Sequence, residues 1–165
     1  NADAIYKVNR KTGRVVWKLG GTTTPRSLEL VNGPADGYPL GGQHDVHVLP
    51  DKTITVFNNR TDLAGSQPRA QRFRIDEDAG TAKIIGTIRN ERVGETFCCG
   101  SAQMLPSKEW LVSWGNSGLT GAYDEAGRPL FRLDLDILWS YRANAVPDGV
   151  VSALRLRKAM NFMNR

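Results

Sequence analysis

The chain has 165 residues, enough for one domain with a hydrophobic core, and its 40% hydrophobic and 24% charged residues are ordinary for a globular domain. The net charge of +5 is concentrated in residues 152–165, which carry four basic residues and no acidic one. The rest of the chain has no basic face with interleaved aromatic residues, so the sequence does not predict nucleic-acid binding. No apolar run approaches the roughly 18 residues that a membrane-spanning helix needs.

Short runs that alternate apolar and polar residues, separated by turn residues, predict β-strands along most of the chain. In residues 14–19, for example, Val15, Trp17 and Leu19 fall on one face. Helical periodicity is hard to find before residue 150, which indicates an all-β fold. We expect strands at residues 5–8, 14–19, 45–49, 53–57, 70–75, 81–88, 110–114 and 130–133.

Two units repeat in order and favour a β-propeller over a sandwich or a barrel. Residues 49–57 match residues 105–114, each a strand, a tight Pro-x-Lys turn and another strand. A strand, an acidic or amide turn ending in Gly, and a second strand recur in 5–19, 71–88 and 122–133. Joined, the units form a four-stranded antiparallel blade. The sequence therefore predicts a partial β-propeller of about two and a half such blades, with residues 44–88 and 101–133 as two superposable blades and a half blade before them.

Two segments do not follow the strand pattern. Residues 20–42 are rich in Thr, Pro and Gly and have no strand pattern, and loops of this length are often functional. Near the end, Ser152 is placed to cap a short C-terminal helix from Ala153 to about Met163. We expect this helix to pack on the outside of the sheet, the alternative being a membrane-surface helix. Residues 1–150 are expected to be the C-terminal part of a propeller domain whose upstream blades are missing, and residues 151–165 a helix or tail.

Few residues in this chain could carry chemistry. The adjacent Cys98 and Cys99 have no metal-ligand spacing, and we expect two reduced or partly buried thiols, with a vicinal disulfide or a bridge to a segment missing from this chain as alternatives. The only histidines are His44 and His47. Strict strand alternation would send these two rings to opposite faces, so they are not expected to form a metal pair. His44 lies at the start of the inner strand of a blade and would point toward the central channel, although a structural role is also open to it.

An ordered set of motifs resembles the bacterial arylsulfotransferase family nearly from end to end. The chain's versions are Ile5–Val8 with Thr12-Gly13 and Val16–Gly21, then Gln43-His44-Asp45 with Leu49-Pro50-Asp51 and Ile54–Asn59, then Arg69–Asp76, Cys98–Gln103 with Leu105-Pro106 and Val112–Gly115, and Ser140–Ala143. The family patterns similar to these are "IYKID…TG…IIWRLGG", "QHD…LPDG…ITLFDNG", "SRALRYRLD", "CCGSA…LPGGNWVVSWGG" and "SYRA". The chain departs from them at Lys52 and Arg60, where the patterns have Gly, and at Asn58, where they have Asp.

The resemblance implies an enzyme that transfers a sulfuryl group from an aryl sulfate to a phenol without the nucleotide donor PAPS. It implies that His44 is the nucleophile and forms a transient sulfohistidine. Gln43, Asn58 and Arg69 are then candidate substrate ligands, and Asp45 is a candidate to orient His44 or its own loop. The family's cationic arginine is expected upstream of this chain, so we expect the chain alone to be incomplete and inactive.

The expected partners are a small aryl sulfate and a phenol, with neither cofactor nor metal, no nucleic acid and no membrane span, and a homo-oligomer stays open. By family resemblance the protein is expected in the periplasm or outside the cell, its signal segment lying outside this chain. The competing hypothesis is a non-catalytic propeller that binds a ligand or a protein, because fold alone does not establish function.

Overall fold

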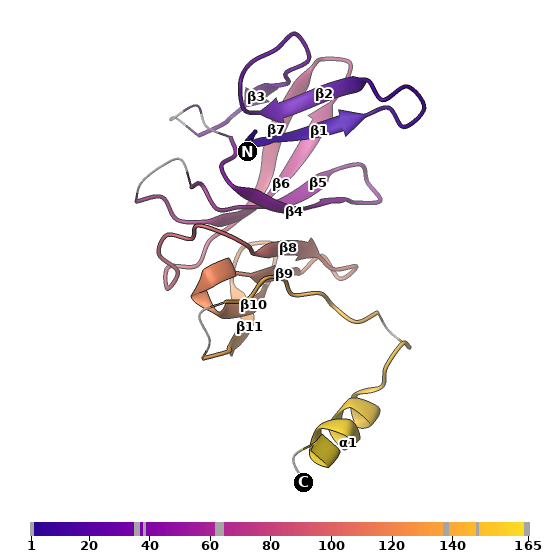
Figure 1. The fold of residues 1–165 in the computed structure, drawn as a ribbon, viewed down its shortest axis with the longest axis vertical. Helices are drawn as coiled ribbons and strands as arrows, with labels where there is room; N and C mark the ends of the chain where they lie inside the picture. Colours follow the sequence, from indigo (N-terminus) through magenta and orange to yellow (C-terminus); the bar gives the residue numbers. More distant parts are fainter. Residues whose placement is uncertain are drawn as a thin grey trace.

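Eleven β-strands, a short 3₁₀ turn and one α-helix follow one another in the computed structural model, which describes residues 2–34, 37, 39–61, 65–136, 139–147 and 149–163. The strands form three sheets of two, five and four strands. The sheets are stacked along the long axis of the molecule with the five-stranded sheet in the middle (Figure 1). They are open, so the prediction of an all-β fold with a partial propeller arrangement and a short C-terminal helix is confirmed.

Most strands pair with their neighbours in the chain, as a propeller blade requires. The middle sheet has the order β3-β7-β6-β5-β4, and the third has the order β11-β10-β9-β8. The two predicted blades correspond to β4–β7 and β8–β11, and the predicted half blade to the β1–β2 hairpin. The elements are β1 (Ala4–Val8), β2 (Val15–Gly20), β3 (Glu29–Val31), β4 (Gln43–Val48), β5 (Ile54–Asn58), β6 (Arg69–Asp76), β7 (Thr81–Ile88), β8 (Ser101–Met104), β9 (Trp110–Ser113), η1 (Gly115–Ser117), β10 (Leu119–Tyr123), β11 (Pro129–Asp134) and α1 (Ala153–Met163).

The two Pro-x-Lys turns have the same geometry. The Lys52 N–H donates to the Leu49 carbonyl and the Lys108 N–H to the Leu105 carbonyl, each at 2.9 Å. Both lysines have a left-handed backbone, with φ of 67° and 69°. Glycine adopts this conformation at the lowest cost, which explains why the family pattern has Gly where Lys52 stands. The internal repeat found in the sequence is thus a repeat of backbone conformation.

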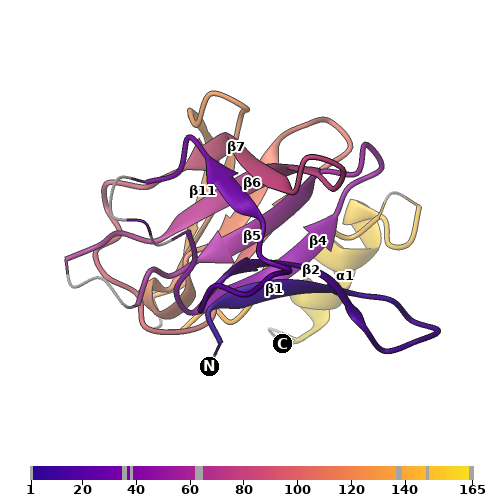
Figure 2. The same ribbon diagram turned by 90° about the horizontal axis from the view of Figure 1, so that it is seen from above.

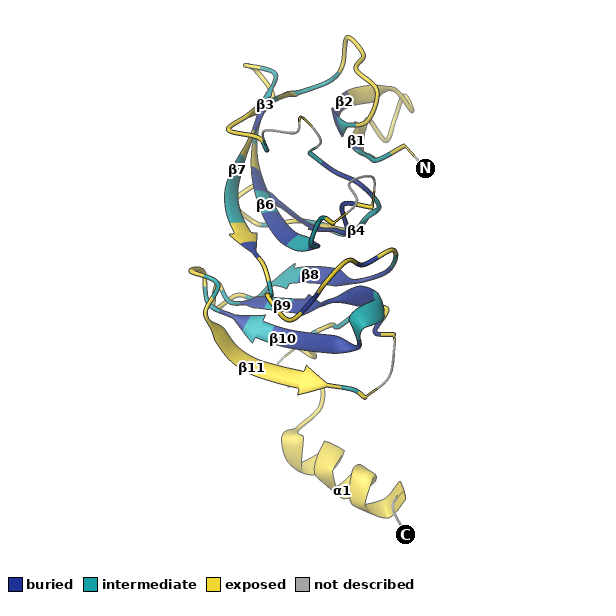
Figure 3. Ribbon diagram, turned by 90° about the vertical axis from the view of Figure 1, so that its left-hand side faces the viewer, coloured by how far each residue is buried: buried dark blue, intermediate teal, exposed yellow. Residues whose placement is uncertain are grey.

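Two apolar clusters join the three layers. Because a strand alternates its faces, Val56 of β5 packs toward the β1–β2 hairpin and the adjacent Phe57 packs toward the third sheet. The sheets overlie one another when seen from above (Figure 2). The buried strands lie between the layers, whereas β11 is exposed along its length (Figure 3). The first cluster includes Ile5, Trp17, Leu19, Ile54, Val56 and Phe73, and the second includes Phe57, Ala70, Ile88, Ala102, Trp110, Val112 and Trp114.

The first irregular segment contains a strand, contrary to expectation, whereas the C-terminal helix forms where predicted. Residues 20–42 contain β3, which pairs in parallel with β7 along Glu29–Val31. This pairing joins segments far apart in the chain, and three residues are too few to produce a readable alternation. The helix α1 forms where predicted, and Ser152 Oγ accepts the Arg155 N–H at 3.2 Å as its cap.

That helix does not pack on the sheet, however. It has no buried residue, and its apolar side chains Leu156, Met160 and Met163 are 47%, 58% and 76% exposed. The residues before it run along the third sheet and then lead the chain away from the sheets (Figure 1). In the part of the chain that the structure describes, no helix has the length and apolarity needed to cross a bilayer.

Candidate functional site

The inner strand β4 contains a β-bulge at Asp45. His44 pairs with Phe57 and His47 with Thr55, so Asp45 and Val46 together face a single residue of β5. Asp45 has φ of 58°, in the left-handed region that the first residue of a G1-type bulge adopts. Asp tolerates this conformation better than most residues do. The sequence thus carries one extra residue in β4, and the strand accommodates it at Asp45.

This bulge overturns the expectation that His44 and His47 point to opposite faces. Phe57 and Thr55 are two residues apart on β5 and share a face, and each histidine lies directly across from one of them. The two rings therefore lie on the same side of the middle sheet, the side that packs toward the third sheet. Strict alternation failed because it has no place for the inserted residue.

The Asp45 side chain is 2% exposed and collects three partners. Its Oδ2 accepts the N–H of Ala102, on the edge strand β8, at 3.1 Å. Its Oδ1 lies 3.1 Å from Nε of Arg142, whose side chain is 44% exposed. Nε2 of His47 lies 3.0 Å from Oδ2 but makes no hydrogen bond to it. Burial of a carboxylate is costly unless such partners compensate it, so Asp45 fixes β4, β8 and the C-terminal segment relative to one another.

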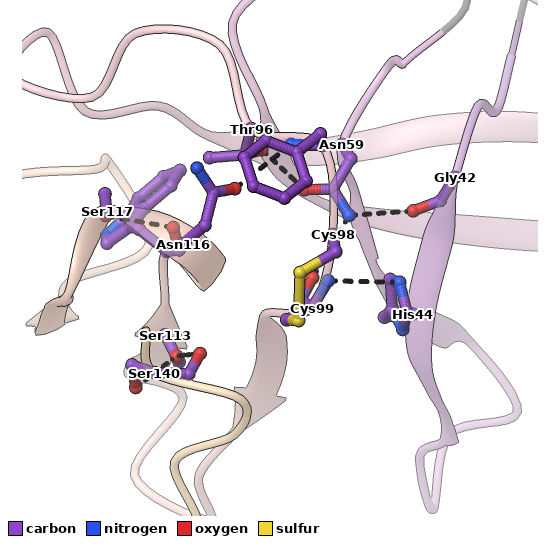
Figure 4. Close-up of a disulfide and its surroundings, with 12 residues drawn as sticks. Gly42, His44, Asn59, Thr96, Cys98, Cys99, Ser113, Asn116, Ser117 and Ser140 are labelled. Carbon is purple, nitrogen blue, oxygen red and sulfur yellow. Dashed lines mark hydrogen bonds between the residues drawn. A yellow bond between two sulfur atoms is a disulfide. The ribbon is translucent and has the colours of Figure 1, made fainter. Parts of the chain in front are cut away.

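His44 is half-buried beside this carboxylate. The backbone N–H of Cys99 donates to its Nε2 at 3.2 Å, so in the neutral ring Nε2 carries the lone pair and Nδ1 carries the proton (Figure 4). Burial lowers the pKa of His44 below its ordinary value of 6.5, the positive charge of Arg142 lowers it further, and Asp45 opposes both effects. The Tyr141 ring lies edge-on, with its centroid 6.4 Å from that of His44. The arrangement keeps the imidazole neutral near pH 7.

The N–H that contacts His44 belongs to a vicinal disulfide, because Cys98 and Cys99 are bonded to each other. The expectation of two reduced thiols is therefore wrong; the sequence left this pairing only as an alternative. Cys99 is buried and has a left-handed φ of 69°. Asn59 fixes this loop to β4, since its Nδ2 donates to the carbonyls of Gly42 at 2.8 Å and Cys99 at 3.1 Å (Figure 4).

The extended segment 139–147 completes the site by running along the inner edge of the third sheet. The Gly100 N–H donates to the Tyr141 carbonyl at 3.0 Å, and the Ala143 N–H donates to Ser101 Oγ at 2.9 Å. These bonds fix the backbone on both sides of Arg142. Ser140 is anchored as well, because Ser113 Oγ donates to its carbonyl at 2.8 Å.

The other predicted site residues lie on the opposite face of the middle sheet. Gln43, Asn58 and Arg69 stand in one row across β4, β5 and β6, in register with one another. Gln43 donates to the carbonyl of Ala4, and Asn58 is fully buried. Asn58 donates to Pro39 O and Gln71 Oε1 and accepts from Gly41 N and Arg60 N. Their role as substrate ligands stays a prediction, and these contacts favour a structural role for Gln43 and Asn58.

Sequence reasoning missed three parts of this site. It expected the cationic arginine upstream of the chain, with Arg69 as a local candidate, which stays a prediction; it assigned no role to Arg142, whose positive charge acts on His44. It assigned no role to the Cys99 N–H or to Asn59. The motif around Ser140–Ala143 and the cysteine pair were the available signals, but contacts between residues so far apart in sequence cannot be read from strand periodicity.

The described residues line two cavities of similar size, and neither includes His44 or Asp45. One, of about 350 Å³, is lined by Arg89, Arg92, Tyr123 and Arg132 among others. The other, of about 340 Å³, lies between the two Pro-x-Lys turns. In the described part of the chain, no group of three His, Cys, Asp or Glu side chains is arranged to hold a metal ion.

The chain matches a known protein family. The family model described as "Arylsulfotransferase (ASST)" matches residues 1–135, which include β4 and the vicinal disulfide. No curated protein matches the sequence. The matched region covers all the strands and ends before Arg142.

Proposed function

We propose, from the premise that this chain belongs to the arylsulfotransferase family, that the protein transfers a sulfuryl group from an aryl sulfate to a phenol through a covalent intermediate on His44. Membership of the family supports a sulfotransferase-type activity in general. The observation that carries the specific mechanism is the neutral His44, whose Nε2 lone pair is free of a proton and whose pKa is lowered. We also propose that the reaction does not use PAPS, because an aryl sulfate already has a good leaving group.

The reaction has two displacement steps at sulfur. In the first, the Nε2 lone pair of His44 attacks the sulfur, a N–S bond forms, the S–O bond to the aryl group breaks, and the aryloxide leaves. In the second, the acceptor phenol attacks the same sulfur and loses its proton to solvent, while the N–S bond breaks and returns the electron pair to His44. The pairing of a neutral nucleophile with a stable leaving group favours the first step.

The backbone N–H of Cys99 has a defined role in this scheme. It donates to Nε2 at 3.2 Å in the resting state, so it must release that lone pair as the N–S bond forms. At that moment the same N–H is within reach of an oxygen of the incoming sulfuryl group. If this N–H transfers its hydrogen bond from Nε2 to the negatively charged sulfuryl oxygen, it stabilises the transition state more than the ground state.

The vicinal disulfide supports placing the protein in an oxidising compartment. Disulfides persist in the periplasm and outside the cell and are rare in the cytosol. We therefore propose a periplasmic or extracellular site of action, with small aryl sulfates and phenols as substrates. A fractionation experiment that found the native protein in the cytoplasm would contradict this placement.

Steady-state kinetics of the full-length protein test the proposed function. With 4-nitrophenyl sulfate as donor and phenol as acceptor, nitrophenol release should require both substrates at steady state. Double-reciprocal plots at several fixed phenol concentrations should be parallel, because the donor's product leaves before the acceptor reacts. Plots that intersect would indicate direct transfer, and an absence of nitrophenol release would support the non-catalytic binding protein instead.

A further inference from the structure

We propose that Arg142 is a catalytic residue that binds the oxygens of the sulfuryl group transferred to His44, and that Asp45 is the residue that positions it. This inference rests on the proposed function, and it assigns the cationic group to a residue of this chain other than Arg69, the candidate that the sequence offered. It concerns residues from opposite ends of the site, one in the bulge of β4 and one in the segment after the last strand.

The position of Arg142 is fixed from two directions. Its backbone is held on both sides by the bonds of Tyr141 to Gly100 and of Ala143 to Ser101. Its side chain is held by Asp45, whose Oδ1 lies 3.1 Å from Nε. Since Asp45 directly follows His44 in the chain, this contact brings the guanidinium to the nucleophile. An arginine held at both ends loses little further conformational freedom when a substrate binds.

The part of Arg142 that remains available suits a sulfate ester. A guanidinium has five N–H donors, and only its Nε lies within ion-pair distance of Asp45. Within the described residues, its terminal nitrogens have no hydrogen-bond partner, and the side chain is 44% exposed. Two parallel N–H groups of a planar guanidinium match two oxygens of a sulfuryl group, a geometry that an ammonium cannot reproduce.

Charge balance gives Asp45 and Arg142 complementary roles. An aryl sulfate carries one negative charge and would be repelled by the Asp45 carboxylate if that carboxylate stood alone. Paired with Arg142, the carboxylate is neutralised and the remaining guanidinium edge faces the approaching anion. In the transition state the negative charge on the transferred oxygens develops within reach of this edge, where a preorganised cation has its largest effect.

The alternative is that Arg142 only neutralises a buried carboxylate. Arg128 is a matched control, since its Nε also pairs with an aspartate, Asp124, at 2.6 Å, but its side chain is 82% exposed on the β10–β11 turn. The experiment uses the full-length protein with 4-nitrophenyl sulfate and phenol. We expect R142A to lower kcat/KM by about 10²-fold or more and R128A to change it less than about twofold.

Two further variants separate catalysis from folding. The double variant R142A/D45N removes the arginine without leaving an unpaired buried charge, and it should remain as impaired as R142A. Recovery of the double variant to the wild-type rate would overturn the proposal, because it would mean that Arg142 is needed only to neutralise Asp45. R142K keeps the charge but loses the fork, and it should be at least about tenfold slower than the wild type; a wild-type rate would contradict binding through the guanidinium.

Inhibition provides a readout that a structural role would not move. Inorganic sulfate should compete with the donor, and R142A should weaken this inhibition about tenfold while leaving inhibition by a non-sulfated phenol analogue unchanged. Added methylguanidinium should partly restore R142A but not H44A. Equal sulfate inhibition in R142A and wild type would overturn the role of Arg142 alone, whereas a wild-type enzyme that turns over without labelling His44 would overturn the proposed function instead.

Discussion

The hairpins β4–β5 and β8–β9 occupy the same place in successive sheets, yet only β4 carries the candidate nucleophile. Both hairpins close with the same turn around a lysine in the left-handed conformation. When positions are counted back from that turn, Val48 is equivalent to Met104 and His47 to Gln103. Beyond this point they differ by one residue. Opposite Val112, β8 has Ala102 alone, whereas opposite Val56, β4 has both Asp45 and Val46.

The inserted residue changes what the strand can do. Without it, Asp45 would point to the opposite face and could reach neither Ala102 nor Arg142. With it, the side chains of His44, Asp45 and His47 all lie on the side of the middle sheet that faces the third sheet. His44 then stands where β8 has Ser101, a residue that holds the C-terminal segment. A bulge in an edge strand re-aims side chains at little cost to the pairing around it.

The largest effect is expected from giving β4 the residue that stands at the equivalent place in β8. His44→Ser should lower turnover of the full-length protein by at least about 10⁴-fold, because the chemical step loses its nucleophile. The matched variant His47→Gln, which gives β4 the Gln103 of β8, should lower turnover less than about tenfold. Turnover is measured by nitrophenol release, and comparable losses in the two variants would contradict the distinction between the two histidines.

A smaller loss is expected from the loop before β8, which acts on β4 through Cys99. Replacing Cys98 and Cys99 by Ser, or reducing the disulfide, frees the backbone that positions the donor to His44. Loss of one well-placed hydrogen bond corresponds to about tenfold in kcat. The melting temperature should change little, because a bond between adjacent residues closes the shortest of loops and removes little entropy from the unfolded chain. An unchanged kcat after complete reduction would show that the loop does not depend on the bond.

The pH dependence of activity should respond to the charges of Asp45 and Arg142 beside His44. His47 and Tyr141 are the other titratable groups near this ring. Since the pKa of His44 is lowered, the acid limb of kcat/KM should lie below pH 6.5. R142A should move this limb to higher pH and D45N to lower pH. The unfolded chain binds the His44 proton more tightly than the folded protein does, so this group lowers stability as the pH falls below 6.5. An acid limb above 6.5 in the wild type would contradict the neutral resting state.

The smallest effects are expected from comparing Gly with Ala at two equivalent positions, Asp45 of β4 and Ala102 of β8. Gly should be the more stabilising residue at position 45 and the less stabilising one at position 102. At Asp45, with φ of 58°, the Gly variant should be more stable than the Ala variant by about 1 kcal/mol. At Ala102, which is fully buried and has an ordinary strand backbone, Ala→Gly should instead destabilise by about 1 kcal/mol. Both are measured by urea unfolding, and the same sign at both positions would show that the bulge imposes no backbone requirement.

What the sequence could predict was local. The turns near Lys52 and Lys108, the strands around them and the Ser152 cap follow from short patterns, and they are where we expected them. The bulge was not predictable from alternation, because the register of β4 is decided by its pairing with β5. The contact of Arg142 with Asp45 joins the two ends of the site and is encoded by the packing of the third sheet on the second. His44 became the candidate nucleophile because a motif, and not a period, marked it, and that role stays a prediction.

Trapping the intermediate is the most direct test of the central claim, that His44 is the nucleophile. The full-length protein is mixed with 4-nitrophenyl sulfate without acceptor, quenched within milliseconds without acid, digested, and examined by mass analysis for a peptide heavier by one sulfuryl group. We expect the label on His44, its disappearance when phenol is added before the quench, and no label in His44→Ser. A label on His47, or full turnover without any labelled histidine, would contradict the account.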